Sequence, residues 1–176
     1  MRAFPVRDPA EAVERWAIWG GVPRYWELAR TYRRHADAVR ALLLDPLGVL
    51  HREPERLLLD EMTDATRAAS ILALIGQGCH RISEIGGRLG QPATSLARPI
   101  GRLVDLGFVT REVPFDAAER DSKRSLYRIG DPFLRTWFRF VEPNRSRLAL
   151  GLLAAVETDL RRDMPAHVGF AWEDLA

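Results

Sequence analysis

The side chains best suited to chemistry in this sequence are arginines, and two of them share one face of a single expected helix with a serine. Ser95, Arg98 and Arg102 follow one another at spacings of three and four residues, which places them on the same side of a helix with a 3.6-residue period. The arginine guanidinium is a planar fork of donors that suits guanine edges and phosphate oxygens. The spacing therefore indicates a helix face that binds double-stranded DNA.

Further basic residues follow this helix in an expected hairpin. Arg111 lies in its first strand, and Lys123 and Arg124 lie just before its second strand. Between residues 81 and 128, nine basic residues stand against six acidic ones, a net charge of +3, although acidic residues inside the loop weaken its positive potential. We expect the nucleic-acid-binding set to be Ser95, Arg98, Arg102, Arg111, Lys123 and Arg124.

Other kinds of site find little support in the residue types. Cys79 is the only cysteine, and the four histidines are dispersed with no pair at helical spacing, so we expect no metal site. No serine lies in a Gly-x-Ser-x-Gly turn, which argues against a hydrolase triad. We therefore expect no catalytic residue and no cofactor in this chain.

The elements that must position the arginines form a recognisable order. Apolar periodicity and glycine stops predict helices over residues 65–77, 82–89 and 92–106, and two short strands follow at 108–113 and 125–129. In the third helix Leu96, Ile100 and Leu103 are expected to face the core, and Pro99 is expected to kink the helix or delay its start. Three helices followed by a charged hairpin are typical of a winged helix-turn-helix.

Helical segments are expected on both sides. Before residue 63 the pattern predicts helices over residues 9–19, from about 23, over 35–44 and over 53–62; after Asp131 it predicts an aromatic-faced helix and a last long helix over 148–162, with Pro165 and Gly169 interrupting the chain beyond it. The predicted fold class is mainly α with a small β-wing. The expected domains are a helical lid-like segment (1–62), a winged helix-turn-helix (63–130) and a helical extension (131–176).

Composition fits this interpretation without deciding it. The chain has 176 residues, 47% of them hydrophobic, and a net charge of +2, which permits nucleic-acid binding but does not demand it. The longest apolar run is too short for the ~20 residues of a bilayer span, and the N-terminal residues lack the apolar core of a signal peptide. We expect a cytoplasmic protein with no membrane partner.

Several segments, taken together and in order, resemble a known family. They are Trp19–Tyr25, Leu47–Leu50 with Glu53 and Pro54, Ser70–Gly78, Arg111–Pro114, Tyr127–Phe133 and Phe138–Asn144. Over essentially the whole chain they resemble the C-terminal half of prokaryotic archaeal-type AAA+ (STAND-like) ATPases. Such proteins carry a P-loop core, a helical lid, a winged helix and a nuclease-like tail.

The resemblance implies a role for one short motif. Gly21, Val22 and Pro23 look like the Gly-x-Pro motif of the lid, whose proline lies against the adenine of bound nucleotide. The resemblance thus makes Gly21 and Pro23 nucleotide-contacting residues in an intact parent protein. From the residues alone, the same motif is also typical of an ordinary helix break.

The chain departs from the family in what it lacks. It contains no Gly-x-x-x-x-Gly-Lys-[Ser/Thr], so it has no loop to cradle phosphates, and we expect no ATP hydrolysis by this chain alone. ATP and Mg²⁺ would belong to an intact parent. The nuclease-like tail is also missing, since only Glu173 resembles its opening glutamate. We therefore expect a non-catalytic C-terminal fragment of such an ATPase.

Two alternatives remain open. The winged helix can serve as a protein–protein interaction module that couples the ATPase core to a partner or to self-association. The chain can also be a stand-alone transcription regulator, for which Leu148–Arg162 is the candidate dimerisation helix.

Overall fold

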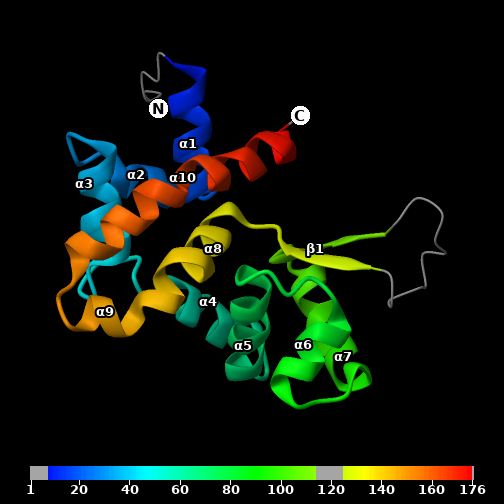
Figure 1. The fold of residues 1–176 in the computed structure, drawn as a ribbon. Helices are drawn as coiled ribbons and strands as arrows, with labels where there is room; N and C mark the ends of the chain where they lie inside the picture. The colour runs from blue at the N-terminus through cyan, green and yellow to red at the C-terminus, as the bar shows by residue number, and fades with distance from the viewer. Residues whose placement is uncertain (1–7, 114–124, 176) are drawn as a thin grey trace. The chain divides into compact units, whose positions relative to one another are not determined.

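The computed structural model describes residues 8–113 and 125–175. These residues are mainly helical, with one two-stranded antiparallel sheet (Figure 1), which confirms the mainly α class with a small β element. The elements are α1 (Pro9–Trp19), α2 (Pro23–Ala29), α3 (His35–Val39), the π-helical turn η1 (Arg40–Leu44), α4 (Glu53–Glu61), α5 (Ala65–Gly76), α6 (Ile82–Leu89), α7 (Ala93–Asp105), β1 (Val109–Glu112), β2 (Leu126–Ile129), α8 (Pro132–Thr136), η2 (Trp137–Val141, π-helical), η3 (Glu142–Asn144, 3₁₀), α9 (Arg145–Ala149) and α10 (Leu153–Leu175).

Some helix starts are set by local capping. The Asp8 carboxylate accepts a hydrogen bond from the backbone N–H of Ala10 at 3.0 Å, and α1 then begins at Pro9. The Asp64 carboxylate likewise accepts from the N–H of Arg67 at 2.9 Å at the start of α5. Such side-chain oxygens satisfy N–H groups that have no partner inside the helix, which is why these boundaries follow from sequence.

The chain divides into two compact units, and one of them is not contiguous in sequence. The first contains the described residues up to 54 together with 140–175, and the second contains 55–139. The first unit thus joins most of the N-terminal helical segment to most of the C-terminal extension. The second holds α5, α6, α7, the sheet and α8.

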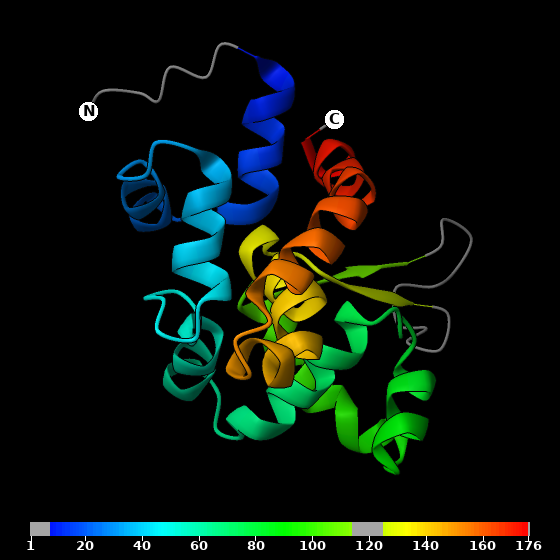
Figure 2. The same cartoon turned by 60° about the vertical axis from the view of Figure 1, so that its left-hand side comes forward.

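In the first unit α1 and α10 lie side by side (Figures 1 and 2). Val13 and Ala17 of α1 form a buried cluster with Ala171 of α10. The buried His167 ring of α10 lies with its Nε2 3.3 Å from the carbonyl oxygen of Ala17. The two ends of the chain are therefore held together by apolar packing and a polar contact.

The last helix differs from the expected one. We predicted one helix over residues 148–162, but α9 ends at Ala149 and α10 begins at Leu153, because Gly151 adopts a φ of 78° that breaks the helix. The helix then continues through Pro165, where an interruption was predicted. Pro165 is exposed while Met164 and His167 are buried, so packing on the buried face sustains the helix and the lost hydrogen bond falls on the solvent side.

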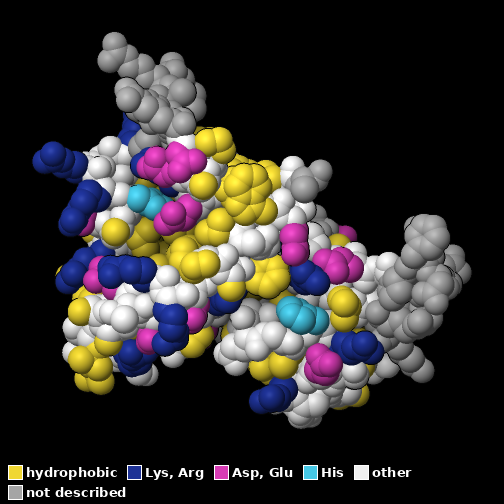
Figure 3. All heavy atoms as spheres, turned by 45° about the horizontal axis from the view of Figure 1, so that its top comes forward, with side chains coloured by type: hydrophobic (Ala, Val, Ile, Leu, Met, Phe, Trp, Pro, Cys, Tyr) yellow, Lys and Arg dark blue, Asp and Glu magenta, His cyan; other side chains and the backbone are white. Residues whose placement is uncertain are grey.

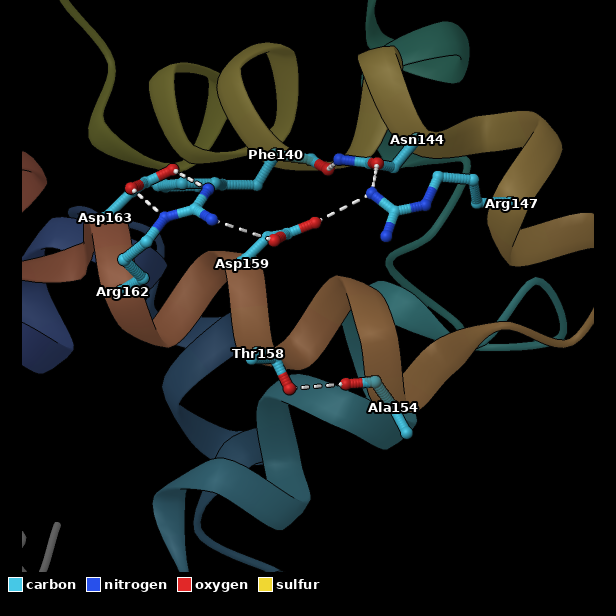
Figure 4. A network of polar contacts seen from close by, with 8 residues as sticks. All are labelled: Phe140, Asn144, Arg147, Ala154, Thr158, Asp159, Arg162 and Asp163. Atoms are coloured by element: carbon cyan, nitrogen blue, oxygen red, sulfur yellow. Dashed lines mark hydrogen bonds and ion pairs between the residues drawn. The ribbon is translucent and has the colours of Figure 1, made fainter.

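A polar network fastens α9 to α10 (Figure 4). The guanidinium of Arg147 donates to Asp159 at 2.8 Å and to the side-chain oxygen of Asn144 at 2.7 Å. Asp159 also accepts from Arg162 at 3.2 Å. Asp159 thus lies between two guanidinium groups and joins the two helices across the turn.

The second unit has a core shared by three helices and the sheet. Its fully buried side chains include Ile71 and Leu72 of α5, Ile85 of α6, and Leu96 and Leu103 of α7. The strands pair antiparallel with Val109 opposite Ile129, and both of these residues are buried.

The sheet of this unit is also tied to the loop between α5 and α6. The backbone N–H of Tyr127 donates to the carbonyl oxygen of His80 at 2.8 Å, and the His80 Nδ1 lies 3.0 Å from the carbonyl oxygen of Tyr127. Tyr127 of β2 is therefore anchored on this loop.

Candidate nucleic-acid interface

The helix that carries the predicted arginines separates an apolar face from a basic one. Leu96, Ile100 and Leu103 are buried, as predicted, and Arg98 and Arg102 are exposed. The helix begins at Ala93 and runs through Pro99 to Asp105, so Pro99 does not delay its start. The two arginines therefore project from the side of α7 opposite the core.

The two arginines differ in what they contact. Within the described residues Arg98 has no hydrogen-bond or ion-pair partner. Nη2 of Arg102 lies 3.7 Å from Oε2 of Glu61 at the end of α4, and both side chains are about half exposed. An anion that binds Arg102 must therefore compete with Glu61, whereas Arg98 is open to it.

Ser95 serves the internal structure of the unit. Its hydroxyl donates to the carbonyl oxygen of Pro92 at 2.8 Å and accepts from the guanidinium of Arg67 at 3.1 Å. The same Arg67 nitrogen contacts the backbone oxygen of Ser95 at 3.2 Å and the side-chain oxygen of Gln91 at 2.5 Å. Ser95 thus fixes the N-terminal turn of α7.

Arg67 also belongs to this site, although it is absent from the residues predicted from sequence. It reaches from α5 to the turn between α6 and α7, and it is half-buried. Its neighbours in sequence are ordinary helix residues, so no local motif marks it. Only the packing of α5 against α7 brings its guanidinium to Gln91 and Ser95.

The turn between α6 and α7 is tight because of Gly86. A Cβ atom at this position would lie 2.7 Å from the carbonyl oxygen of Gln91, closer than real Cβ contacts allow. The backbone N–H of Gln91 in turn donates to the carbonyl oxygen of Gly86 at 2.9 Å. The absence of a side chain therefore sets how closely α7 follows α6.

Of the predicted basic residues of the hairpin, Arg111 lies within the described part of the chain. Arg111 of β1 donates through Nε to the hydroxyl of the buried Ser125 at 2.9 Å. Lys123 and Arg124 lie outside the described residues. Arg128 of β2, which was not predicted, pairs with Glu112 at 3.1 Å.

Gly21 and Pro23 lie in the first unit, between α1 and α2. Both residues are exposed, and Pro23 is the first residue of α2. A Cβ atom at Gly21 would meet the Trp16 ring at an ordinary 3.5 Å, whereas the preceding Gly20 has a φ of 59° and ends α1. The helix break is thus made by Gly20, and Gly21 is free of steric demand.

Aromatic side chains support this break from both sides. Trp19 and Tyr25 are buried. The indole N–H of Trp26 donates to the carbonyl oxygen of Gly20 at 2.8 Å. The Trp26 indole therefore ties α2 to the residue that ends α1.

Comparisons with known proteins return one relative. The chain is 27% identical over 173 residues to "Uncharacterized protein MJECL04" of Methanocaldococcus jannaschii, a match that covers 98% of this chain and 38% of that protein. The chain thus spans well under half the length of this relative. No protein-family model and no solved structure matches the sequence. Among the described residues, no helix is long and apolar enough to cross a membrane.

Proposed function

We propose that α5, α6, α7 and the β1–β2 sheet form a winged helix-turn-helix that binds double-stranded DNA without catalysing a reaction. The observation that carries the proposal is the exposure of Arg98 and Arg102 on α7, opposite a face that is buried against the rest of the unit. A helix fixed in this way can present its outer face to the major groove. Three helices followed by an antiparallel pair of strands match the order of elements in this class.

The Arg67 contacts support the same proposal. A recognition helix must hold its angle while its outer side chains meet phosphates and base edges. Arg67, Gln91 and Ser95 fasten the start of α7 to α5, and Gly86 lets α6 approach this turn closely. In this proposal Ser95 and Arg67 position the helix, and Arg98 and Arg102 make the contacts.

The test is fluorescence anisotropy of the purified chain with a random-sequence duplex across a range of salt concentrations. Each phosphate contact contributes about −0.9 to the slope of log K against log salt concentration. Replacing Arg98 and Arg102 with Ala is expected to weaken binding and to flatten the slope by roughly 1 to 2.

The matched control for this double variant is Arg30→Ala with Arg33→Ala. It removes the same charge from exposed positions of the first unit. If both double variants lower affinity and slope equally, only the net charge of the chain matters and the assignment to α7 is wrong.

A second candidate function is a protein–protein interaction module. It is favoured by the internal contacts of three predicted residues: Arg102 pairs with Glu61, Arg111 with Ser125, and Ser95 with Arg67. In this alternative the α7 face meets a partner protein or another copy of the chain. Absence of DNA binding at low salt would favour it.

We further propose that the chain is the C-terminal part of an archaeal-type ATPase. The greater length of the archaeal relative is compatible with a larger parent protein. Gly21 and Pro23 are exposed, so an adenine ring could reach them in such a parent. The purified chain is expected to show no ATP turnover, and turnover that survives purification to homogeneity would contradict this.

A further inference from the structure

The first unit contains an open groove that the proposed function does not use. It has a volume of about 620 Å³ and lies between α1, the α3–η1 segment and α10. Ile18, Leu44 and Met164 are buried and contribute to its lining. The groove therefore has an apolar base built by the same helices that join the two ends of the chain.

One wall of the groove is a stripe of α10 side chains spaced four residues apart. Leu160, Met164, Val168 and Trp172 all line it. Trp172 is 47% exposed, although a tryptophan ring normally buries a large apolar area. From Leu160 to Trp172 the helix rises about 18 Å, so the wall is as long as roughly three turns of a second helix.

Carboxylates lie along the edges of this apolar surface. Figure 3 shows acidic side chains and a histidine beside the hydrophobic area on this face. Glu11 and Glu14 come from α1 and Glu157 comes from α10, and they are partly exposed. With Asp8, four acidic residues line the groove against one arginine, Arg161.

The carboxylates already have basic neighbours, and these use one oxygen each. Oε1 of Glu11 contacts Arg15 at 2.5 Å, Oε1 of Glu14 lies 3.8 Å from His35, and Oε2 of Glu157 lies 3.3 Å from Arg40. A carboxylate accepts hydrogen bonds at both oxygens, so each can also accept from a ligand.

The charge of Glu14 is maintained at neutral pH. The nearby His35 ring lowers the pKa of the Glu14 carboxyl. The His35 ring is itself held by the indole N–H of Trp19, which donates to Nε2 at 3.0 Å. This edge of the groove is therefore fixed and negative.

We propose that the groove binds a basic amphipathic helix from a protein partner. An apolar trough about three turns long fits the apolar face of a helix, which is recognised through side chains at i, i+3, i+4 and i+7. The acidic edges select arginine or lysine on the flanks of that helix, and they disfavour acidic helices and phosphate-bearing ligands. This proposal is independent of DNA binding by the second unit.

The test uses the full chain and three labelled synthetic peptides of about four helical turns. The first carries Leu along one face and Arg on the flanks, the second replaces Arg with Glu, and the third is a scrambled form of the first. Fluorescence anisotropy gives the affinities, and ¹H–¹⁵N spectra follow the indole N–H of Trp172. The basic amphipathic peptide is expected to bind at least about tenfold more tightly than either control, and to shift the Trp172 signal.

Variants of groove residues test whether the peptide binds in the groove. Trp172→Ala is expected to weaken binding of the basic peptide about five- to tenfold, and so, separately, is the double variant Glu14→Gln with Glu157→Gln. Glu27→Gln with Asp60→Asn removes the same charge from exposed positions outside the groove and is expected to have no effect. Circular dichroism of each variant establishes that it is folded.

Several outcomes would overturn the proposal. Equal binding of the acidic or scrambled peptide would show that helix shape and charge are not recognised. Binding without a Trp172 shift, or unaffected by the groove variants, would place the peptide elsewhere. Equal competition by arginine amide would make this a small-cation site, and dimerisation abolished by Trp172→Ala would assign the groove to a second copy of the chain.

Discussion

At the scale of single residues, Arg98 and Arg102 project from the same face of α7 but have different surroundings. Arg102 faces Glu61 at 3.7 Å, while Arg98 has no such partner among the described residues. Exposed ion pairs of this kind contribute about 0–1 kcal/mol. A phosphate that binds Arg102 therefore has to displace Glu61, a weak partner, whereas a phosphate that binds Arg98 has no such partner to displace among the described residues.

Removing the competing carboxylate is expected to strengthen DNA binding. Glu61→Gln releases Arg102 and removes a negative charge near the phosphates, so the affinity for duplex DNA is expected to rise about two- to fivefold at fixed salt. Anisotropy measures the change. Asp60→Asn, an exposed neighbour, is the control, and an equal gain in that variant would attribute the effect to general charge and not to the Arg102 pair.

At the scale of elements, two adjacent glycines of α6 have opposite roles. A Cβ atom at Gly86 would lie 2.7 Å from the carbonyl oxygen of Gln91, but nothing lies within 4 Å of one at Gly87. Gly86→Ala is therefore expected to lower the free energy of unfolding by about 1–3 kcal/mol. Gly87→Ala is expected to raise it by up to about 1 kcal/mol, because alanine favours a helix.

Urea unfolding of the two variants tests this expectation, and each serves as the control for the other. The turn between α6 and α7 also sets the position of the proposed recognition helix. Gly86→Ala is therefore expected to weaken DNA binding as well, while Gly87→Ala preserves it. Equal free energies of unfolding for the two variants would show that the turn shifts at little cost to accommodate a Cβ atom at position 86.

The start of α8 gives an element-level prediction about pH. The Asp131 carboxylate caps this helix by accepting from the N–H of Leu134 at 2.8 Å. Burial raises the pKa of the Asp131 carboxyl, although the backbone N–H groups of Leu134 and Phe133 act in the opposite direction. Because the folded state holds this proton more tightly, the contribution of Asp131 to stability is fully present below its unfolded pKa of about 3.9 and is lost as the pH rises through its folded pKa.

Asp131→Asn keeps a capping oxygen and removes the buried charge. Its melting temperature is expected to equal or exceed that of the unmodified chain at pH 7, and the advantage is expected to shrink as the pH falls toward about 4. Asp131→Ala, which loses the cap, is expected to be less stable by about 1 kcal/mol. Thermal unfolding at the two pH values tests these expectations. A clear loss of stability in the Asn variant at pH 7 would contradict a raised pKa of Asp131 in the folded state.

The elements that were predictable from sequence are those whose ends are set locally. α6 was predicted with the bounds it has, because its apolar spacing and the following Gly90 are both local signals. α10 was not, because Gly151 and Pro165 look alike as helix breakers in sequence. Only the burial of Met164 and His167 within the first unit separates the real break from the apparent one.

At the scale of the whole molecule, the pairing of the chain's two ends could not be read from sequence. The contact of His167 with Ala17 joins residues 150 positions apart, and no local pattern predicts such a distance. The same limit applies to the candidate interface. The exposed face of α7 follows from helical period, but the partners Glu61 and Arg67 come from other helices and appear only once these pack.

This packing bears on the alternative of a stand-alone regulator, which requires a dimerisation helix. The candidate segment, Leu148–Arg162, spans α9 and the first part of α10, and its Leu148 and Val156 are buried within the chain. Leu148 and Val156 are thus not available to a dimer, and the exposed large apolar side chains of this segment are Leu150 and Leu152 at the break between α9 and α10. The chain is therefore expected to sediment as a monomer at concentrations of tens of micromolar.

Sedimentation velocity in the presence and absence of duplex DNA tests this expectation. A monomer that binds DNA supports a single recognition unit, with no preference for paired half-sites. A dimer in solution, together with binding that favours half-sites about 10 base pairs apart, would instead support the regulator. That outcome would require a self-association surface other than the buried side of α10, and the exposed Trp172 stripe would be the first surface to mutate.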